Sequence, residues 1–185
     1  MKTTIYYFTG TGNSLAAARR IAAELQAWGN GTTELRKITA APGEEPAAEA
    51  ERIGFVFPTY AYGLPRIVAE FAAAVPLPEK AYVFGVASNC GIPGPVLKQL
   101  KKILRNRGED LHAGFTVLDP SSSLVNDPDR DGIQRLMISA NRGEFPEPLE
   151  NRLPEIIDAA GSLRRQPVET SKALTNFLGG LLYRM

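Results

Sequence analysis

A short loop rich in glycine and hydroxyl side chains, set between an expected strand and an expected helix, constrains this chain most. Residues 3–8 are rich in β-branched and aromatic side chains, as strands are, and an apolar stripe of helical period begins at Leu15. Between these segments stand Thr9, Gly10, Thr11, Gly12, Asn13 and Ser14. Such a loop gathers backbone N–H groups at the N-terminus of a helix, where an anion is stabilised. Because the loop contains no Lys or Arg, the sequence predicts a phosphate site built from uncharged donors.

Other phosphate-binding loops fit this stretch less well. A nucleoside-triphosphate loop ends in Gly-Lys-Ser/Thr, whereas Asn13 follows Gly12 here. A dinucleotide-binding loop has a third glycine where this chain has Leu15. An ordinary strand-to-helix turn capped by Thr or Asn is the alternative that binds no ligand.

Composition narrows the class of protein further. A length of 185 residues with 44% hydrophobic and 22% charged residues is typical of one globular domain. Because 21 basic residues balance 20 acidic ones, nucleic-acid binding is not expected. The single cysteine, Cys90, excludes an intrachain disulfide and a cysteine-rich metal or iron–sulfur site in this chain. No apolar run approaches the roughly 20 residues of a membrane span, and Gly10 and Gly12 interrupt the N-terminal apolar stretch before it resembles a signal peptide, so the cytoplasm is the expected compartment.

Strand and helix patterns alternate along the chain. The expected strands cover residues 3–8, 32–38, 53–57, 81–87 and 113–118. The expected helices cover residues 15–28, a segment beginning at Pro65, residues 95–106 and a final segment through 156–163. This alternation predicts an α/β fold with a doubly wound parallel sheet and helices on both faces. Ligands of such sheets bind beyond the carboxyl ends of the strands, so the loops after the first, third and fourth strands should meet in one site.

Three motifs together point to a particular family. The hydroxyl-x-Thr-Gly-x-hydroxyl pattern of residues 9–14, with the Phe-Pro-Thr-Tyr-Ala-Tyr-Gly-Leu-Pro-Arg segment at 57–66 and the glycine-rich turn at 91–94, resembles the flavodoxin half of bacterial and archaeal flavodoxin–ferredoxin fusion proteins. The resemblance implies a flavodoxin-like three-layer sandwich with strand order 2-1-3-4-5 and FMN as cofactor. The cofactor-binding residues that it implies are Thr9, Gly10, Thr11, Gly12, Asn13, Ser14, Thr59, Tyr60, Ala61, Tyr62, Gly63, Ser88, Asn89, Cys90 and Gly91.

Several of these residues carry specific expectations. Tyr60 and Tyr62 are candidates to stack on the flavin ring, although one of the two is expected only to pack in the loop. The Gly63 peptide either turns its carbonyl towards flavin N5 on reduction or forms a rigid turn. The N–H groups of residues 89–91, assisted by Ser88, are expected to bind the pyrimidine oxygens. No catalytic residue or metal ligand is assigned. Since no basic side chain lies in these loops, a low potential for the second reduction step is expected.

The resemblance also suggests partners. Members of the family usually continue into a domain with two four-cysteine clusters, which this chain lacks, so an iron–sulfur domain or protein is the expected partner. The basic residues at 98, 101, 102, 105 and 107 are either a solvated helix face or a docking face for an acidic ferredoxin. The first hypothesis is therefore an FMN-binding electron carrier. The alternatives are an NAD(P)H-dependent flavin reductase acting on a quinone or similar acceptor, and a scaffold that has lost its flavin.

The C-terminal part of the chain is harder to interpret. Residues 1–166 are expected to form the flavodoxin-like domain, and residues 167–185 an apolar helical tail or linker. Residues 119–153 form a long excursion after the fifth strand, of which 120–124 are expected beside the flavin ring. The tail is expected to pack on its own domain, on a missing domain, on a membrane surface or on a second copy as a homodimer.

Overall fold

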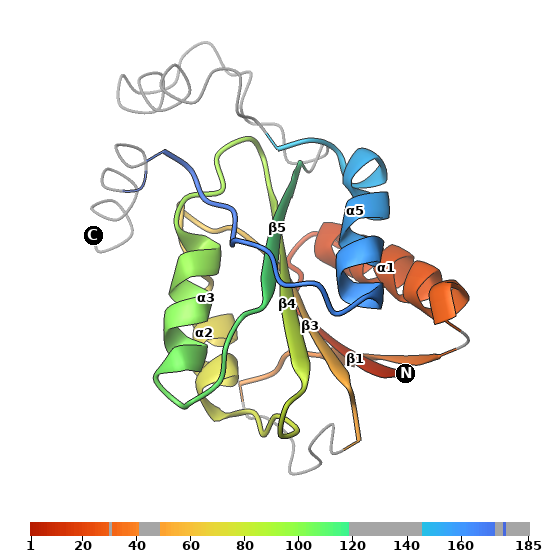
Figure 1. Cartoon of the computed structure of the whole chain (residues 1–185). Coiled ribbons are helices and arrows are strands. Elements are labelled where there is room, and N and C mark those ends of the chain that lie inside the picture. The colour runs from red at the N-terminus through yellow and green to blue at the C-terminus, as the bar shows by residue number, and fades with distance from the viewer. Residues whose placement is uncertain (30, 41–48, 119–145, 173–175, 177–185) are drawn as a thin grey trace, which may run out of the picture.

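A five-stranded parallel sheet forms the centre of the molecule in the computed structural model, which describes residues 1–29, 31–40, 49–118, 146–172 and 176 (Figure 1). Its strands are β1 (Lys2–Tyr7), β2 (Thr32–Lys37), β3 (Arg52–Pro58), β4 (Tyr82–Asn89) and β5 (Ala113–Leu118). All neighbouring strands pair in parallel, in the order β2-β1-β3-β4-β5. The predicted strand order and the predicted flavodoxin-like α/β fold are thereby confirmed.

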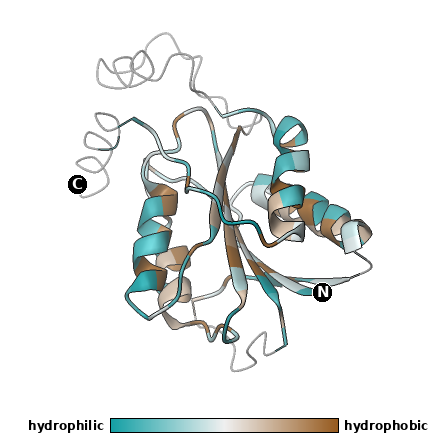
Figure 2. Cartoon of the chain, in the orientation of Figure 1, coloured by the Kyte–Doolittle hydropathy of each residue, from teal (hydrophilic) through white to brown (hydrophobic). Residues whose placement is uncertain are grey.

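Helices cover both faces of this sheet. Figure 1 shows α1 (Asn13–Gly29) and α5 (Leu149–Gly161) on one face, and α2 (Arg66–Ala74) and α3 (Val96–Arg105) on the other. Each helix buries apolar residues of one face, and apolar and polar segments alternate along its ribbon in Figure 2. No helix among the described residues is both long and apolar enough to cross a membrane.

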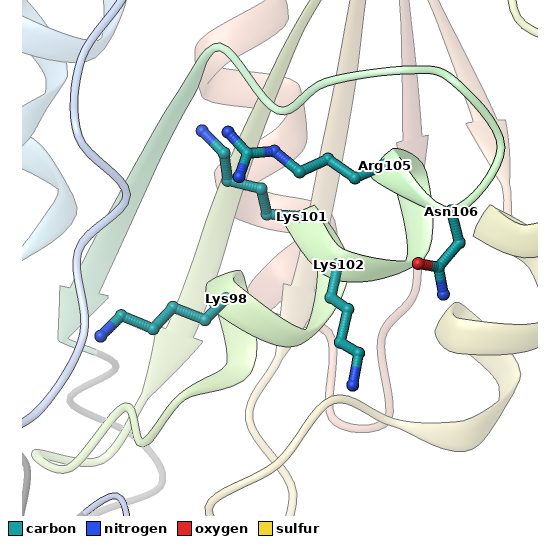
Figure 3. Close-up of a pocket in the computed structure, with 5 residues that line it drawn as sticks. All are labelled: Lys98, Lys101, Lys102, Arg105 and Asn106. Carbon is teal, nitrogen blue, oxygen red and sulfur yellow. The ribbon is translucent and has the colours of Figure 1, made fainter.

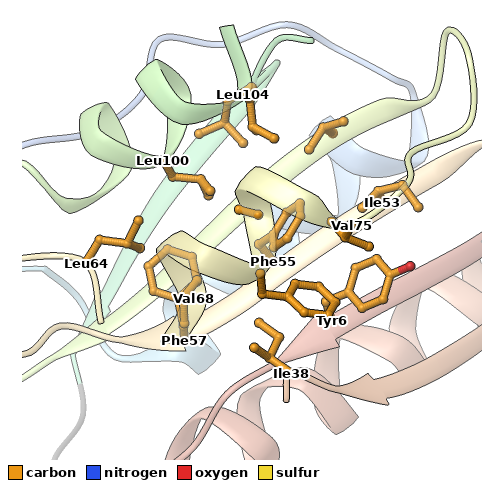
Figure 4. Close-up of a cluster of buried hydrophobic side chains, with 14 of the residues drawn as sticks. Tyr6, Ile38, Ile53, Phe55, Phe57, Leu64, Val68, Val75, Leu100 and Leu104 are labelled. Carbon is orange, nitrogen blue, oxygen red and sulfur yellow. The ribbon is translucent and has the colours of Figure 1, made fainter. Parts of the chain in front are cut away.

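The two layers of helices enclose two hydrophobic cores. Phe55 and Phe57 point from β3 into the core below α2 and α3, where they are fully buried with Val68 and Leu100 (Figure 4). Val56, the residue between them, lies in the opposite core, below α1 and α5. This alternation is the two-residue period of a strand buried on both faces. Burying each of these large side chains contributes about 1.5–3 kcal/mol to folding.

A buried arginine ties α5 to the amino end of the sheet. Arg52, at the start of β3, is only 1% exposed. Its Nε donates to Thr3 Oγ1 at 2.8 Å, and its Nη1 donates to the carbonyl of Ala160 at 3.5 Å. Burial lowers the pKa of Arg52, partly offset by the neighbouring carboxylate of Glu51. The guanidinium therefore lies at the C-terminal end of α5, where the helix dipole favours a cation.

The segment that follows α5, residues 166–172 (here the strap), runs along the outer edge of β5. Figure 1 shows it crossing beside β5 towards α3. The Gln166 N–H donates to the carbonyl of His112 at 2.8 Å, and the Glu169 N–H donates to the carbonyl of Gly114 at 3.0 Å. The Glu169 carboxylate also accepts from the N–H of Thr116 at 2.6 Å. The strap thus bonds to β5 beyond residue 166; the boundary between a domain at 1–166 and a tail at 167–185 stays a prediction.

Two large apolar residues at the ends of the expected helices lie outside the core. Trp28 is 51% exposed, and a Cβ at Gly161 would lie 2.4 Å from its Nε1, so the indole lies over the C-terminal end of α5 instead of beneath α1. Leu163 is 41% exposed because α5 ends at Gly161 and Leu163 takes a left-handed φ of 56°. The expectations for residues 120–124 and for the helical part of the tail at 177–185 lie outside the described residues.

Candidate functional site

The predicted phosphate loop has the geometry of an anion site. Residues 9–12 link β1 to α1, and Gly12 takes a φ of 101° that favours glycine. The Gly12 N–H donates to Thr9 Oγ1 at 2.9 Å, which closes the loop. Helix α1 begins at Asn13, and the N–H of Ala16 bonds to the carbonyl of Gly12 at 2.9 Å, so the positive end of the helix dipole lies at this loop. The local geometry therefore combines hydroxyls, helix N–H groups and the positive end of a helix dipole.

A pair of buried serines joins this loop to the end of β4. Ser14 is 2% exposed and Ser88 is 4% exposed, and their hydroxyl oxygens lie 2.9 Å apart. One hydroxyl donates to the other, so one proton of the pair remains to donate to a further acceptor. Ser88 lies beside the phosphate loop in this arrangement, whereas the sequence associates it with the pyrimidine end of the flavin.

The second loop contains a tight turn with unusual backbone angles. The N–H of Tyr60 donates to the carbonyl of Gly63 at 3.0 Å, and the N–H of Gly63 donates back at 2.8 Å. Ala61 and Tyr62, the central residues, both take left-handed φ values, 45° and 65°. Such angles in residues other than glycine cost about 1–3 kcal/mol each and are concentrated at functional sites. Because both polar groups of Gly63 bond to Tyr60, a carbonyl flip there requires breaking a bond; the flip stays a prediction.

The side chain of Tyr60 lies over the phosphate loop. A Cβ at Gly10 would lie 2.3 Å from Tyr60 Oη, so a larger residue there would displace the tyrosine hydroxyl. The Tyr60 ring also contacts the edge of Phe8, with 6.0 Å between centroids, and remains 43% exposed. Tyr60 therefore connects the first and second loops. Stacking of Tyr60 or Tyr62 on a flavin ring is not tested by this geometry and stays a prediction.

The third loop is shaped by one asparagine side chain. Asn89 Oδ1 accepts from the N–H of Gly91 at 2.9 Å, and Asn89 Nδ2 donates to the carbonyl of Val117 at 3.2 Å. The N–H of Gly91, expected to bind the pyrimidine oxygens, is thus already bonded. The neighbouring Cys90 is a half-buried free thiol. Its N–H and that of Asn89 keep their predicted role as a hypothesis.

One buried hydroxyl between the loops has no protein partner. Among the described residues, Thr59 Oγ1 is buried without a hydrogen-bond partner. The N–H of Thr59 bonds to the carbonyl of Ser88 at 2.8 Å, which places this residue between the second and third loops. An unpaired buried hydroxyl costs about 1–3 kcal/mol. Together with the uncharged, hydroxyl-rich phosphate loop, this orphan fits a polar cofactor such as FMN.

Gly94, in the glycine-rich turn at 91–94, joins the loops through contacts that the sequence does not predict. Gly94 takes a φ of 64°, and a Cβ there would lie 2.2 Å from the carbonyl oxygen of Tyr62. Its N–H and carbonyl both bond to Ser171 of the strap. The position of Gly94 before Pro95 indicates a turn, but no sequence pattern connects it with residue 171.

A basic face lies on α3, which follows the third loop. An open pocket of about 360 Å³ lies on this face. Figure 3 shows the residues that line it, which are Lys98, Lys101, Lys102, Arg105 and Asn106. Lys101 and Arg105 pair with Asp110, at 3.4 and 3.0 Å. Within the described part of the chain, Lys98 and Lys102 form no ion pair and are exposed. The face is thus net positive but partly neutralised.

The comparisons with known proteins support the fold. No protein-family model matches the sequence, and no curated protein matches it. Among solved structures, a flavodoxin from the domain Archaea shares 17% identity and a TM-score of 0.55, with 88% of this chain and 99% of that chain covered. A short-chain flavodoxin associated with a non-canonical PDU bacterial microcompartment shares 11% identity and a TM-score of 0.55, covering 88% and 98%. The azoreductase AzrA shares 9% identity and a TM-score of 0.52, covering 88% and 100%.

These similarities define the class of fold: the chain has a flavodoxin-like fold. At such low identities they do not extend to a ligand or an activity. They give no support to the narrower resemblance to flavodoxin–ferredoxin fusion proteins, which stays a prediction.

Proposed function

We propose that this protein binds FMN at the carboxyl edge of its sheet and carries electrons. The observation that carries the proposal is the uncharged loop at the N-terminus of α1, closed by the 2.9 Å bond between Gly12 and Thr9 and joined to β4 through Ser14 and Ser88. When bound, FMN supplies one- and two-electron redox chemistry that no side chain can supply.

The phosphate of FMN would be held by the first loop. The hydroxyls of Thr9 and Thr11, the free proton of the Ser14–Ser88 pair and the first N–H groups of α1 are the donors. Each charge-assisted hydrogen bond contributes about 1.5–3 kcal/mol. Four or five such bonds hold a phosphate dianion without a Lys or Arg, since the helix dipole adds to them.

The flavin ring would lie between the second and third loops. Tyr60 and Tyr62 supply aromatic surfaces there, and the unpaired hydroxyl of Thr59 supplies a polar group. The left-handed turn at Ala61 and Tyr62 fixes where the peptide groups of this loop point. These residues exclude water from one side of the ring and orient it; none of them is proposed to transfer a proton.

The alternative function is flavin-dependent reduction of a small acceptor, since the azoreductase AzrA has a similar fold. The two functions differ in the electron donor. Rapid reduction of the bound flavin by NADH or NADPH alone supports a reductase, whereas reduction only through an iron–sulfur protein supports a carrier.

We propose an acidic iron–sulfur protein as the partner, docked on α3. The argument is charge complementarity: Lys98 and Lys102 are exposed and have no ion-pair partner among the described residues, and the pocket of Figure 3 lies between them and Arg105. Such association is steered by charge and weakens as salt screens it. Reversing both charges, with Lys98→Glu and Lys102→Glu, should therefore slow electron transfer from an acidic ferredoxin at low ionic strength while leaving FMN affinity unchanged.

FMN titration of the purified protein, followed by quenching of flavin fluorescence, tests the proposed cofactor. Thr11→Val removes an exposed hydroxyl from the phosphate loop and should weaken binding by about tenfold or more, the equivalent of one charge-assisted bond. Thr32→Val is the matched control, because Thr32 is an exposed threonine at the opposite edge of the sheet. A wild-type protein that is purified colourless and fails to bind added FMN refutes the proposal.

A further inference from the structure

The strap does more than cover β5: its far end bonds to the third loop. The N–H of Gly94 donates to Ser171 Oγ at 2.9 Å, and the N–H of Ser171 donates to the carbonyl of Gly94 at 3.4 Å. The hydroxyl of Thr170 also donates to that carbonyl, at 3.3 Å. Ser171 is only 7% exposed, so water competes little for these bonds. Both backbone groups of Gly94 are therefore held by the strap.

The strap itself is anchored on two other elements. Val168 pairs with Gly114 of β5, and the carboxylate of Glu169 accepts from the N–H and the hydroxyl of Thr116, at 2.6 and 2.7 Å. The other carboxylate oxygen accepts from Arg152 of α5. Since Arg152 is only 16% exposed, this ion pair is partly shielded from solvent. The strap is thus a fixed support from which Ser171 reaches Gly94.

Gly94 in turn packs against the tight turn of the second loop. Its α-carbon lies so close to the carbonyl of Tyr62 that an added Cβ would be 2.2 Å from that oxygen. The Tyr60–Gly63 turn has two left-handed residues, and strained backbone of this kind persists only where its surroundings hold it. The contact with Gly94 is such a restraint, and it acts on the carbonyl of Tyr62 in the loop that is proposed to contact the flavin ring.

We propose that Ser171 is a positioning residue for the flavin site, acting through Gly94 on the Tyr60–Gly63 turn. The inference rests on the proposed FMN-binding function and extends it to a residue of the C-terminal segment. Removing the Ser171 hydroxyl leaves the N–H of Gly94 without its acceptor, so only the two longer bonds to the Gly94 carbonyl still hold the third loop against the Tyr62 carbonyl. Flavin affinity and the order of the turn should both decrease.

Three variants test this. Ser171→Ala removes the acceptor, Ser171→Thr retains the hydroxyl, and Tyr82→Phe removes one hydrogen bond of similar type, from Tyr82 Oη to the carbonyl of Arg164 at 2.6 Å, at the opposite end of the sheet. We expect Ser171→Ala to weaken FMN binding about fivefold to tenfold, Ser171→Thr to restore it, and Tyr82→Phe to leave it unchanged. Equal FMN affinity of Ser171→Ala and wild type overturns the inference.

Hydrogen exchange gives a measurement that does not depend on FMN. In the flavin-free protein, the N–H groups of Tyr60 and Gly63 each donate to the carbonyl of the other residue across the turn. We expect these two amides to exchange faster in Ser171→Ala than in Tyr82→Phe, and Thr170→Val to act in the same direction if Ser171→Ala does not fold. Unchanged exchange overturns the coupling. A wild-type protein that binds no FMN overturns the proposed function, and the flavin role of Ser171 with it, whereas the exchange result still decides whether the strap holds the turn.

Discussion

Substituting Gly94 by alanine should destabilise the fold in two ways, through its left-handed backbone and through its contact with the Tyr62 carbonyl. The left-handed φ of 64° is unfavourable for alanine by about 1–2 kcal/mol. Its Cβ would also lie 2.2 Å from the carbonyl oxygen of Tyr62, where ordinary contact begins at 3.4 Å. The third loop must therefore move away from the turn, which strains the bond from the Gly94 N–H to Ser171 Oγ, worth about 1 kcal/mol. We expect Gly94→Ala to lower the free energy of unfolding by about 3 kcal/mol.

The chain offers a matched control for the backbone part of this cost. Gly108, after α3, takes a φ of 85°, and an added Cβ there meets nothing within 4 Å. Gly108→Ala should therefore pay only the conformational cost, about 1–2 kcal/mol. Gly12→Ala, at a φ of 101° and also without neighbours, should lose a similar amount of stability but in addition weaken FMN binding, because it lies in the phosphate loop.

Urea unfolding at constant pH measures the difference. With a slope of about 2 kcal/mol per molar, the midpoint of Gly94→Ala should fall by about 1.5 M and that of Gly108→Ala by about 0.5–1 M. Equal losses in the two variants would refute the close contact between Gly94 and the Tyr62 carbonyl, and with it the link between the third loop and the turn.

Three further measurements follow from other parts of the molecule. Burial lowers the pKa of His112 below its usual 6.5, and its Nδ1 accepts from the N–H of Val83 at 2.9 Å. Protonation of His112 therefore favours the unfolded chain, and the free energy of unfolding should decrease as the pH falls below about 6.5. This decrease should be smaller in His112→Asn. An identical pH dependence in both proteins would contradict this. Arg52→Ala should lower the free energy of unfolding by about 3 kcal/mol, because it empties a buried site and leaves the hydroxyl of Thr3 unpaired. Arg52→Met should recover at least half of this loss, because its side chain fills the site; equal free energies of unfolding for the two variants would count against the role of packing. The second reduction step of bound FMN should have a potential below that of free FMN, since the three loops contain no Lys or Arg and each 1.4 kcal/mol is worth about 59 mV for one electron; a redox titration at or above the free value rejects this.

The fold follows from local patterns that a sequence displays openly. β3 and β4 are continuous apolar runs because both of their faces are buried, and β5 was bounded correctly at Ala113–Leu118 for the same reason. The helical stripes of α1 and α3 indicate which side faces the strands. The pattern fails near helix ends, where Trp28 and Leu163 keep the apolar period but the chain has already left the face of the sheet.

The meeting of the three loops could also be predicted, because the carboxyl ends of parallel strands share one edge. Their internal hydrogen bonds could not. Asn89 illustrates the difficulty, since its side chain competes with a ligand for the N–H of Gly91, and composition does not reveal which acceptor wins. Ser14 and Ser88 likewise pair across 74 positions of sequence.

The strap is the part of the described structure that no local sequence pattern predicts. Its bonds join residues as far apart as Gly94 and Ser171, and its length is too short for a periodic signal. Glu169 reads as an ordinary surface carboxylate in the sequence, although it occupies the place of a backbone acceptor beside Thr116. Contacts of this kind depend on where α5 ends and in which direction the chain then continues, and the tertiary structure determines both.

That carboxylate also has a bearing on how copies of the protein meet. An open sheet has two border strands, each able to recruit a foreign chain through its unpaired amides. At β5 the strap already bonds to the carbonyls of His112 and Gly114 and, through the Glu169 carboxylate, to the N–H of Thr116. On β2 the side chains of Glu34, Arg36 and Lys37 place charge along the border. Pairing of the sheet with a second molecule is therefore opposed at both border strands. Fibrils that form through β5 would first require the strap to dissociate from this strand.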